Sequence, residues 1–145
     1  MPHILLVEDE ALVRLALKMA LTEAGFEVST AEDGAAALEA VAAAAFDIVV
    51  TDLQMPRMGG LELVAALHQR RPELPVVVTT GCGPVDDGEA FGKLRARGIP
   101  VIQKPFMPEA VADAVRARLG LGRGAGASHH RLGREPSRCY EAALT

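Results

Sequence analysis

Hydrophobic and polar positions in the first 120 residues alternate between two patterns. Short, nearly continuous apolar runs, typical of strands covered on both faces, alternate with longer stretches of helical period. The predicted strands span residues 3–7, 27–31, 47–51, 75–80 and 99–103. The predicted helices span residues 10–25, 33–45, 60–71, 86–98 and 108–120. This strict alternation predicts right-handed βαβ units, and therefore an α/β fold with an open, doubly wound, five-stranded parallel sheet.

Glycine and proline mark several of the predicted helix ends. Gly25 follows the first helix as a C-terminal stop, and Pro72 closes the third. The fourth helix has the weakest pattern, because Gly88 and Gly92 lie inside it. Each interior glycine costs a helix about 1 kcal/mol relative to alanine. We therefore expect the fourth helix to be short or mobile.

Composition divides the 145 residues at about residue 120. Residues 1–120 carry 11 Lys and Arg against 17 Asp and Glu, a net charge of −6, whereas residues 121–145 carry 4 Arg against 2 Glu, net +2. The second segment is rich in Gly, Ser and Arg and lacks apolar periodicity, which is typical of disorder. The prediction is one domain at 1–120 and a basic, disordered tail at 121–145.

The overall charge and the chain start exclude several classes of protein. A net charge of −4 gives no reason to expect binding to nucleic acid or to an acidic membrane. No apolar run approaches the roughly 18 residues that span a bilayer, and the first residues lack the basic start of a signal peptide. Cys82 and Cys139 lie far apart and match no metal-ligand spacing. We therefore expect a cytoplasmic protein.

Chemically active side chains follow four of the five predicted strands. Glu8 and Asp9 come after the first strand, Asp52 after the third, Thr80 at the end of the fourth and Lys104 after the fifth. In such sheets ligands bind outside the carboxyl ends of the strands. Clustered carboxylates need a neutralising charge, which Mg²⁺ supplies, and a lysine suits a phosphoryl oxygen. The pattern predicts a site for a phosphoryl group beside Mg²⁺, with a carboxylate as nucleophile.

Four short motifs carry a resemblance to a known family. They are the acidic pair in "LLVEDE", the stretch "TDLQMPRMGG", the threonine in "VVVTTG" and "KPF" at 104–106. Each is weak alone, but together, in this order and spacing, residues 2–120 resemble the receiver domain of two-component response regulators, of the chemotaxis single-domain type. The resemblance implies a flavodoxin-like (βα)5 fold with strand order 2-1-3-4-5.

The resemblance also implies a role for each residue at the strand ends. Asp52 would accept a phosphoryl group from a phosphohistidine on a sensor histidine kinase, a hybrid kinase or a phosphotransfer protein. Glu8 and Asp9 would position Mg²⁺, with Asp52 and the backbone carbonyl of Gln54 as further ligands. The protein would catalyse only its own phosphoryl transfer and dephosphorylation, and would signal by protein contact or onward transfer to an unknown target.

The remaining roles concern the switch. Lys104 would pair with the carboxylate and then with the phosphoryl group, and Thr80 would swing toward a phosphoryl oxygen. Pro105 would follow a cis peptide bond, which a Lys-Pro pair allows at modest cost. Family members commonly carry Tyr or Phe at the position of Val101, so the usual coupling through a ring is missing here. Cys82, two residues beyond Thr80, and Gln54 are candidates for tuning the lifetime of the acyl phosphate.

Simpler interpretations and other classes stay open at this point. Asp52 could be a turn residue, and Glu8 and Asp9 could cap the first helix. The 25 residues after 120 are too few for a DNA-binding output domain, so the expectation is a stand-alone receiver. The alternatives are a degenerate receiver that only binds proteins, a receiver fragment of a hybrid kinase, a flavin or nucleotide binder, and a phosphohydrolase. The last two lack, respectively, a glycine-rich phosphate loop and the second acid of a DxD motif.

Overall fold

The computed structural model describes residues 1–55, 58–81 and 84–121, with the side chains of 84–87 left aside. Its strands are β1 (His3–Val7), β2 (Glu27–Ala31), β3 (Ile48–Asp52), β4 (Val76–Thr80) and β5 (Val101–Gln103). Its helices are α1 (Ala11–Glu23), α2 (Gly34–Ala43), α3 (Gly60–Arg70), α4 (Pro84–Ala96) and α5 (Pro108–Arg118). The strands pair in parallel in the order β2-β1-β3-β4-β5, which confirms the predicted fold class.

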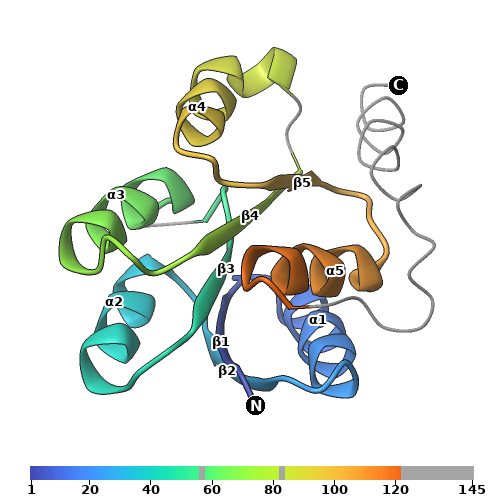
Figure 1. Cartoon of the computed structure of the whole chain (residues 1–145). Coiled ribbons are helices and arrows are strands. Elements are labelled where there is room, and N and C mark those ends of the chain that lie inside the picture. Colours follow the sequence, from blue (N-terminus) through green and yellow to red (C-terminus); the bar gives the residue numbers. More distant parts are fainter. Residues whose placement is uncertain (56–57, 82–83, 122–145) are drawn as a thin grey trace.

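Helices cover both faces of the sheet (Figure 1). The buried apolar side chains form two separate hydrophobic layers, one on each face. Along β1, Ile4 and Leu6 pack into the layer under α1 and α5, whereas Leu5 and Val7 pack into the layer under α2, α3 and α4. Successive side chains of a strand point to opposite faces, so a strand covered on both sides must be apolar throughout. This explains the continuous apolar runs in the sequence.

Helix α4 was predicted at residues 86–98 and expected to be short or mobile. It is not short: it is 13 residues long, and both of its ends lie two residues earlier in the chain than predicted. Gly88 and Gly92 do lie inside it, but both are exposed, whereas Ala90 and Leu94 are buried against the sheet. Burial of apolar side chains by tertiary packing outweighs the low helix propensity of the two glycines.

The predicted tail at 121–145 falls outside the described residues apart from Leu121. Gly120, which follows α5, has a positive φ of 74°. None of the described helices is a candidate for crossing a bilayer, given their length and apolar character.

Gly60 lets α3 begin directly against the end of β3. Its N–H donates to the carbonyl of Leu53 at 2.8 Å. A Cβ at this position would lie 2.6 Å from the Cα of Leu53 and still closer to the carbonyl oxygen of Asp52. Both neighbours are backbone atoms that cannot move aside without moving Asp52. Only glycine therefore allows the strand that carries Asp52 and the following helix to approach this closely.

We predict that Gly60→Ala destabilises the protein by about 1–3 kcal/mol, the usual cost of an overpacked buried position. Gly92→Ala is the matched control, since a Cβ there meets nothing within 4 Å in an exposed part of α4. It should stabilise the protein by about 0.5–1 kcal/mol through helix propensity. Urea unfolding of both variants measures the difference, and equal stabilities would contradict the close approach.

Candidate functional site

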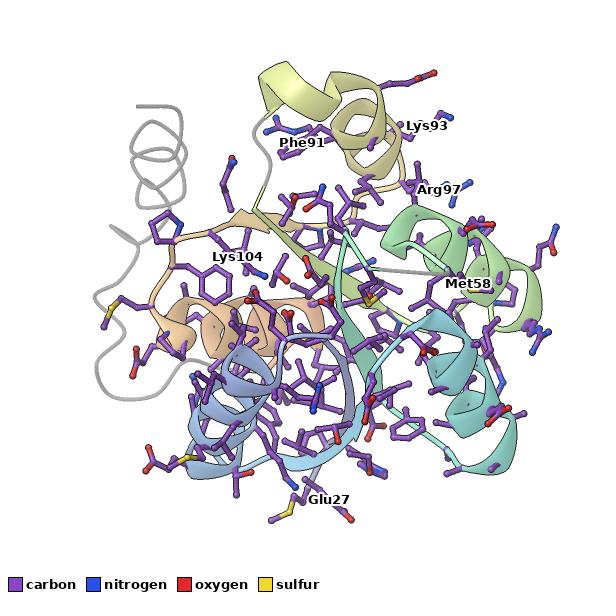
Figure 2. The ribbon with its side chains drawn as sticks, turned by 180° about the vertical axis from the view of Figure 1, so that it is seen from behind. Glu27, Met58, Phe91, Lys93, Arg97 and Lys104 are labelled. Carbon is purple, nitrogen blue, oxygen red and sulfur yellow. The ribbon has the colours of Figure 1, made fainter. Side chains whose placement is uncertain are left out.

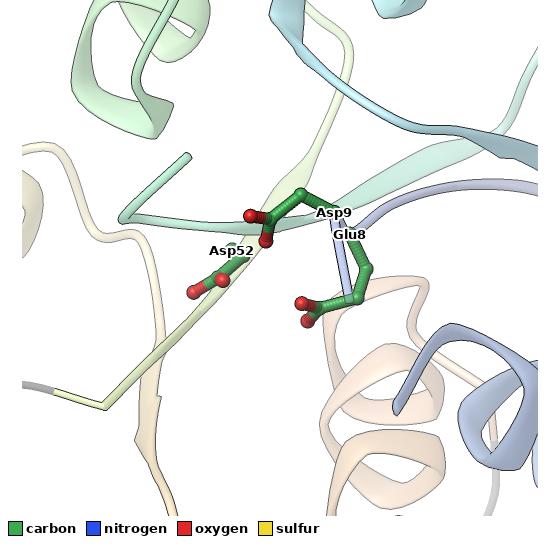
Figure 3. Close-up of side chains that lie close together, drawn as sticks. All are labelled: Glu8, Asp9 and Asp52. Carbon is green, nitrogen blue, oxygen red and sulfur yellow. The ribbon is translucent and has the colours of Figure 1, made fainter. Parts of the chain in front are cut away.

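Three carboxylates meet at the carboxyl edge of the sheet, where β1 and β3 end side by side. Glu8 and Asp9 follow β1, and Asp52 is the last residue of β3. One oxygen from each lies within 4.8 Å of those of the other two. Figure 3 shows the three side chains close together. Glu8 is only 1% exposed and Asp52 4%, whereas Asp9 faces solvent. Two acids are thus buried beside a third that remains open to solvent.

Lys104 reaches into this cluster from the end of β5 (Figure 2). Its Nζ lies 3.4 Å from Oε1 of Glu8 and 3.4 Å from Oδ2 of Asp52. Its backbone N–H donates to the carbonyl of Thr80 at 2.7 Å, which fixes the start of the loop to the end of β4. The peptide bond between Lys104 and Pro105 is cis. A single ammonium group therefore bridges the two buried carboxylates.

Burial of these charges moves their pKa values. Burial, and after it the charge of Asp52, raises the pKa of Glu8 to about 7, although Lys104 acts in the opposite direction. Burial also raises the pKa of Asp52, against the lowering effects of Lys104 and of the Gln54 N–H. Burial by itself lowers the pKa of Lys104, but the carboxylates of Asp52 and Glu8 outweigh it and the pKa is raised. The lysine therefore stays charged while the carboxylates retain protons more readily than usual.

Two observations fit this donor set to a hard divalent cation. Oδ1 of Asp52 is buried and has no hydrogen-bond partner among the residues that the structure describes, while Oδ2 faces Lys104. The oxygens of Glu8 and Asp9 converge on the same space. Mg²⁺ is usually bound by one or two carboxylates together with water and phosphate oxygens. The three acidic side chains of this cluster provide carboxylate oxygens of this kind.

Thr80 lies at the end of β4 and contacts the loop that follows Asp52. Its Oγ1 donates a hydrogen bond to Oε1 of Gln54 at 3.0 Å. Neighbouring Thr79 is the register partner of Asp52 and is buried in the strand. Of the two threonines that end β4, Thr80 is the one whose side chain contacts Gln54. The predicted metal role of the Gln54 carbonyl stays a prediction.

The simpler interpretation of Glu8 as a helix cap holds in part. Its Oε2 accepts the N–H of Glu10, the first residue flanking α1, at 3.2 Å.

Val101 is half-buried and packs in the layer under α2, α3 and α4. Cys82, a candidate for tuning the lifetime of the acyl phosphate, lies outside the described residues.

Sequence reasoning missed Gln103, and it missed the contact between the Gln54 side chain and Thr80. The Gln54 side chain was expected only to tune lifetime, and its bond to Thr80 was not foreseen. Gln103, the last residue of β5, is a buried polar residue whose Nε2 finds no hydrogen-bond partner among the described residues. A polar residue ending an otherwise apolar strand, "VIQ", was the available signal.

Comparisons with known proteins agree with this site. The family model of the response regulator receiver domain matches residues 4–116. The DNA-binding transcriptional regulator NtrC of Escherichia coli K12 is 38% identical over 112 residues, which are 77% of this chain and 24% of NtrC. The response regulator protein FleR of Pseudomonas aeruginosa is 38% identical over 119 residues, 82% of this chain and 24% of FleR. The chain therefore spans about a quarter of these two relatives.

Solved structures give the same result. Chemotaxis protein CheY4 of Vibrio cholerae has a TM-score of 0.72 and 30% identity, and the match covers 81% of this chain and 98% of that one. The response regulator TrrA of Thermotoga maritima, solved in complex with Mg²⁺-BeF, has a TM-score of 0.71 and 26% identity over 81% of this chain and 98% of that one. With the parallel sheet, the acidic cluster and the family match over most of its length, this chain belongs to the receiver-domain family of two-component response regulators.

Proposed function

We propose that this receiver accepts a phosphoryl group on Asp52 from a phosphohistidine of a sensor histidine kinase, a hybrid kinase or a phosphotransfer protein. The observation that carries the proposal is the state of the Asp52 carboxylate. One of its oxygens pairs with Lys104, and the other is buried with no hydrogen-bond partner in the described ranges 1–55, 58–81 and 84–121. In the transfer an Asp52 oxygen forms a bond to phosphorus, while the bond from phosphorus to the donor imidazole nitrogen breaks and leaves its electron pair on that nitrogen.

The other site residues stabilise the charge of the transferring group. Lys104, which already lies 3.4 Å from Asp52, would pair with a phosphoryl oxygen. Glu8, Asp9, Asp52 and the carbonyl of Gln54 would hold Mg²⁺, which supplies neutralising charge to the phosphoryl oxygens. The solved complex of TrrA with Mg²⁺-BeF supports this assignment.

The alternative of a receiver that only binds proteins lacks a supporting observation. Glu8 and Asp52 are both buried, and they share the single positive charge of Lys104. Burying an incompletely neutralised charge is costly, and a module that only binds proteins gains nothing from that cost. The complete set of acids and Lys104 favours phosphoryl acceptance. Whether the resulting signal passes by protein contact or by onward transfer depends on partners outside this chain.

An exposed apolar surface beside the site suits the protein that donates the phosphoryl group. On α1, Leu12, Leu15 and Met19 are 81%, 54% and 57% exposed, at a spacing that places them along the helix surface. A groove of about 350 Å³ runs from α1 to Lys104 and Phe106. A donor must cover the surroundings of Asp52 to deliver its histidine, and exposed apolar patches of this kind mark protein contacts. We assign this surface to the phosphodonor protein.

The first test is incubation of the purified chain with acetyl phosphate and Mg²⁺, followed by intact-mass measurement. We expect the gain of one phosphoryl group in the wild type and none in Asp52→Asn, because the amide cannot act as the nucleophile. Asp113→Asn is the matched control, since Asp113 lies on α5 in an ion pair with Arg116. Phosphorylation of Asp52→Asn to the wild-type extent would reject Asp52 as the acceptor.

The pKa of Glu8 makes Mg²⁺ binding dependent on pH. With a pKa of about 7, Glu8 binds a proton below neutrality and must lose it before its carboxylate can neutralise Mg²⁺. The apparent affinity should therefore fall about tenfold from about pH 8 to about pH 6, since one pKa unit corresponds to a tenfold change. Isothermal titration in buffers of different ionisation enthalpy measures both the affinity and the released proton.

Glu8→Gln provides the control for this titration. It should bind Mg²⁺ more weakly at high pH but lose most of the pH dependence, because the titrating group is gone. A pH dependence that persists unchanged in Glu8→Gln would assign the titration to another group.

For the docking surface, Leu15→Gln should slow phosphotransfer at least about fivefold from any histidine kinase that phosphorylates the wild type, an order typical of one lost interface anchor. Phosphorylation by acetyl phosphate should stay unchanged, since that donor needs no protein contact. Leu121→Gln is the control, because Leu121 is also exposed but lies beside Met1 and Asp47, away from the site. Equal slowing with both donors would indicate a disturbed site in place of a docking surface.

A further inference from the structure

Gln103 is a buried residue whose side-chain NH₂ group makes no hydrogen bond within the described part of the chain. It ends β5, is 3% exposed, and its Nε2 has no partner among the described residues. Buried polar groups in folded proteins nearly always have a partner, because an unmade hydrogen bond leaves the cost of desolvation uncompensated. An apolar residue would fill this strand position without that cost. The amide therefore suggests a partner that it gains in a second state of the site.

The sheet register places Gln103 beside Thr80. The two residues are register partners across β4 and β5, so their side chains leave the same face of the sheet. The preceding pair on that face, Val78 and Val101, packs in the layer under α2, α3 and α4. Neighbouring strands lie about 4.8 Å apart, which brings a glutamine amide within reach of the threonine hydroxyl.

On its other side Thr80 contacts Gln54. The Thr80 hydroxyl donates to Oε1 of Gln54 at 3.0 Å. A hydroxyl has one hydrogen to donate and two lone pairs with which to accept. The hydrogen that is given to Gln54 cannot be given to a phosphoryl oxygen at the same time. Donation to a phosphoryl group on Asp52 therefore requires that Thr80 leave Gln54.

We propose that Gln103 is a positioning residue for Thr80 in the phosphorylated state, an inference that rests on the proposed phosphorylation of Asp52. When the Thr80 hydroxyl donates to the phosphoryl group, the Nε2 of Gln103 donates to Oγ1 of Thr80 and holds it there. Gln54 and Gln103 then act in opposite directions on the same hydroxyl. Gln54 favours the resting position of Thr80, and Gln103 favours the position engaged with the phosphoryl group.

The test uses beryllium fluoride with Mg²⁺ as a stable substitute for the phosphoryl group. Gln103→Met keeps the length of the side chain without its donor, and we expect it to bind beryllium fluoride about five- to tenfold more weakly than the wild type. Gln54→Met should bind it more tightly, because the resting partner of Thr80 is lost. Gln69→Met, an exposed glutamine on α3, is the matched control and should bind as the wild type does.

A double-mutant cycle separates positioning from packing. If Gln103 acts through Thr80, then Gln103→Met has no further effect on affinity in a Thr80→Ala background. An equal loss in both backgrounds would assign Gln103 a packing role only and overturn the proposal.

A readout on the wild type guards against variants that fold poorly. The side-chain amide of Gln103 should shift in ¹⁵N NMR spectra when beryllium fluoride binds, since its Nε2 gains an acceptor. An unchanged amide in a chain that does bind beryllium fluoride would also overturn the proposal. By contrast, a wild type that gains no phosphoryl group from acetyl phosphate or from any kinase would reject the proposed function itself.

Discussion

The imbalance of charge around Asp52 is the constraint on which the rest of this structure depends. When ionised, Glu8, Asp9 and Asp52 carry three negative charges, and Lys104 brings one positive charge to them. Because Glu8 and Asp52 are buried, water screens this excess poorly, and the pKa of Glu8 rises to about 7. The site can relieve the excess by binding either a proton or a cation. A divalent cation neutralises the excess negative charge more fully than one proton does. Its positive charge would also attract the negatively charged phosphoryl group of the proposed reaction.

The topology of the sheet brings these charges together, and backbone contacts hold them in place. Parallel strands deliver their carboxyl ends to one edge, so residues that are more than forty positions apart meet without any long loop. Gly60 brings α3 against the backbone of Asp52, and the Lys104 N–H fixes the end of β5 to the end of β4. The acid and the lysine are therefore both held through their backbones.

The sequence predicted most of the fold because buried parallel strands leave a strong pattern. The bounds of β1 and β2 agree with the prediction, whereas β5 begins two residues late. Pro100 has no N–H to give, although its carbonyl still accepts from Val78. Helix α4 is not short, one of the two outcomes expected for it, because burial of residues such as Leu94 outweighs its low helix propensity.

The candidate site was predictable to the same extent and for the same reason. Glu8 and Lys104 directly follow strands and Asp52 ends one, so the topology alone brings the three residues together. The contact of Gln54 with Thr80 depends on the path of a loop and the rotamer of a long side chain, which no periodicity encodes. The burial of Gln103 depends on the cover that neighbouring elements give to the last residue of a strand.

The energies of the hydrogen bonds that Thr80 can make decide which way the hydroxyl points. A neutral bond such as the one to Gln54 contributes about 0.5–1.5 kcal/mol net. A bond to an ionised acceptor is roughly twice as strong, so a charged phosphoryl oxygen on Asp52 would compete successfully for the same hydrogen. The margin is small, about 1 kcal/mol by these figures. In the proposed switch, a modest contribution from the Gln103 amide would therefore be enough to change the population of the engaged state of Thr80 several-fold.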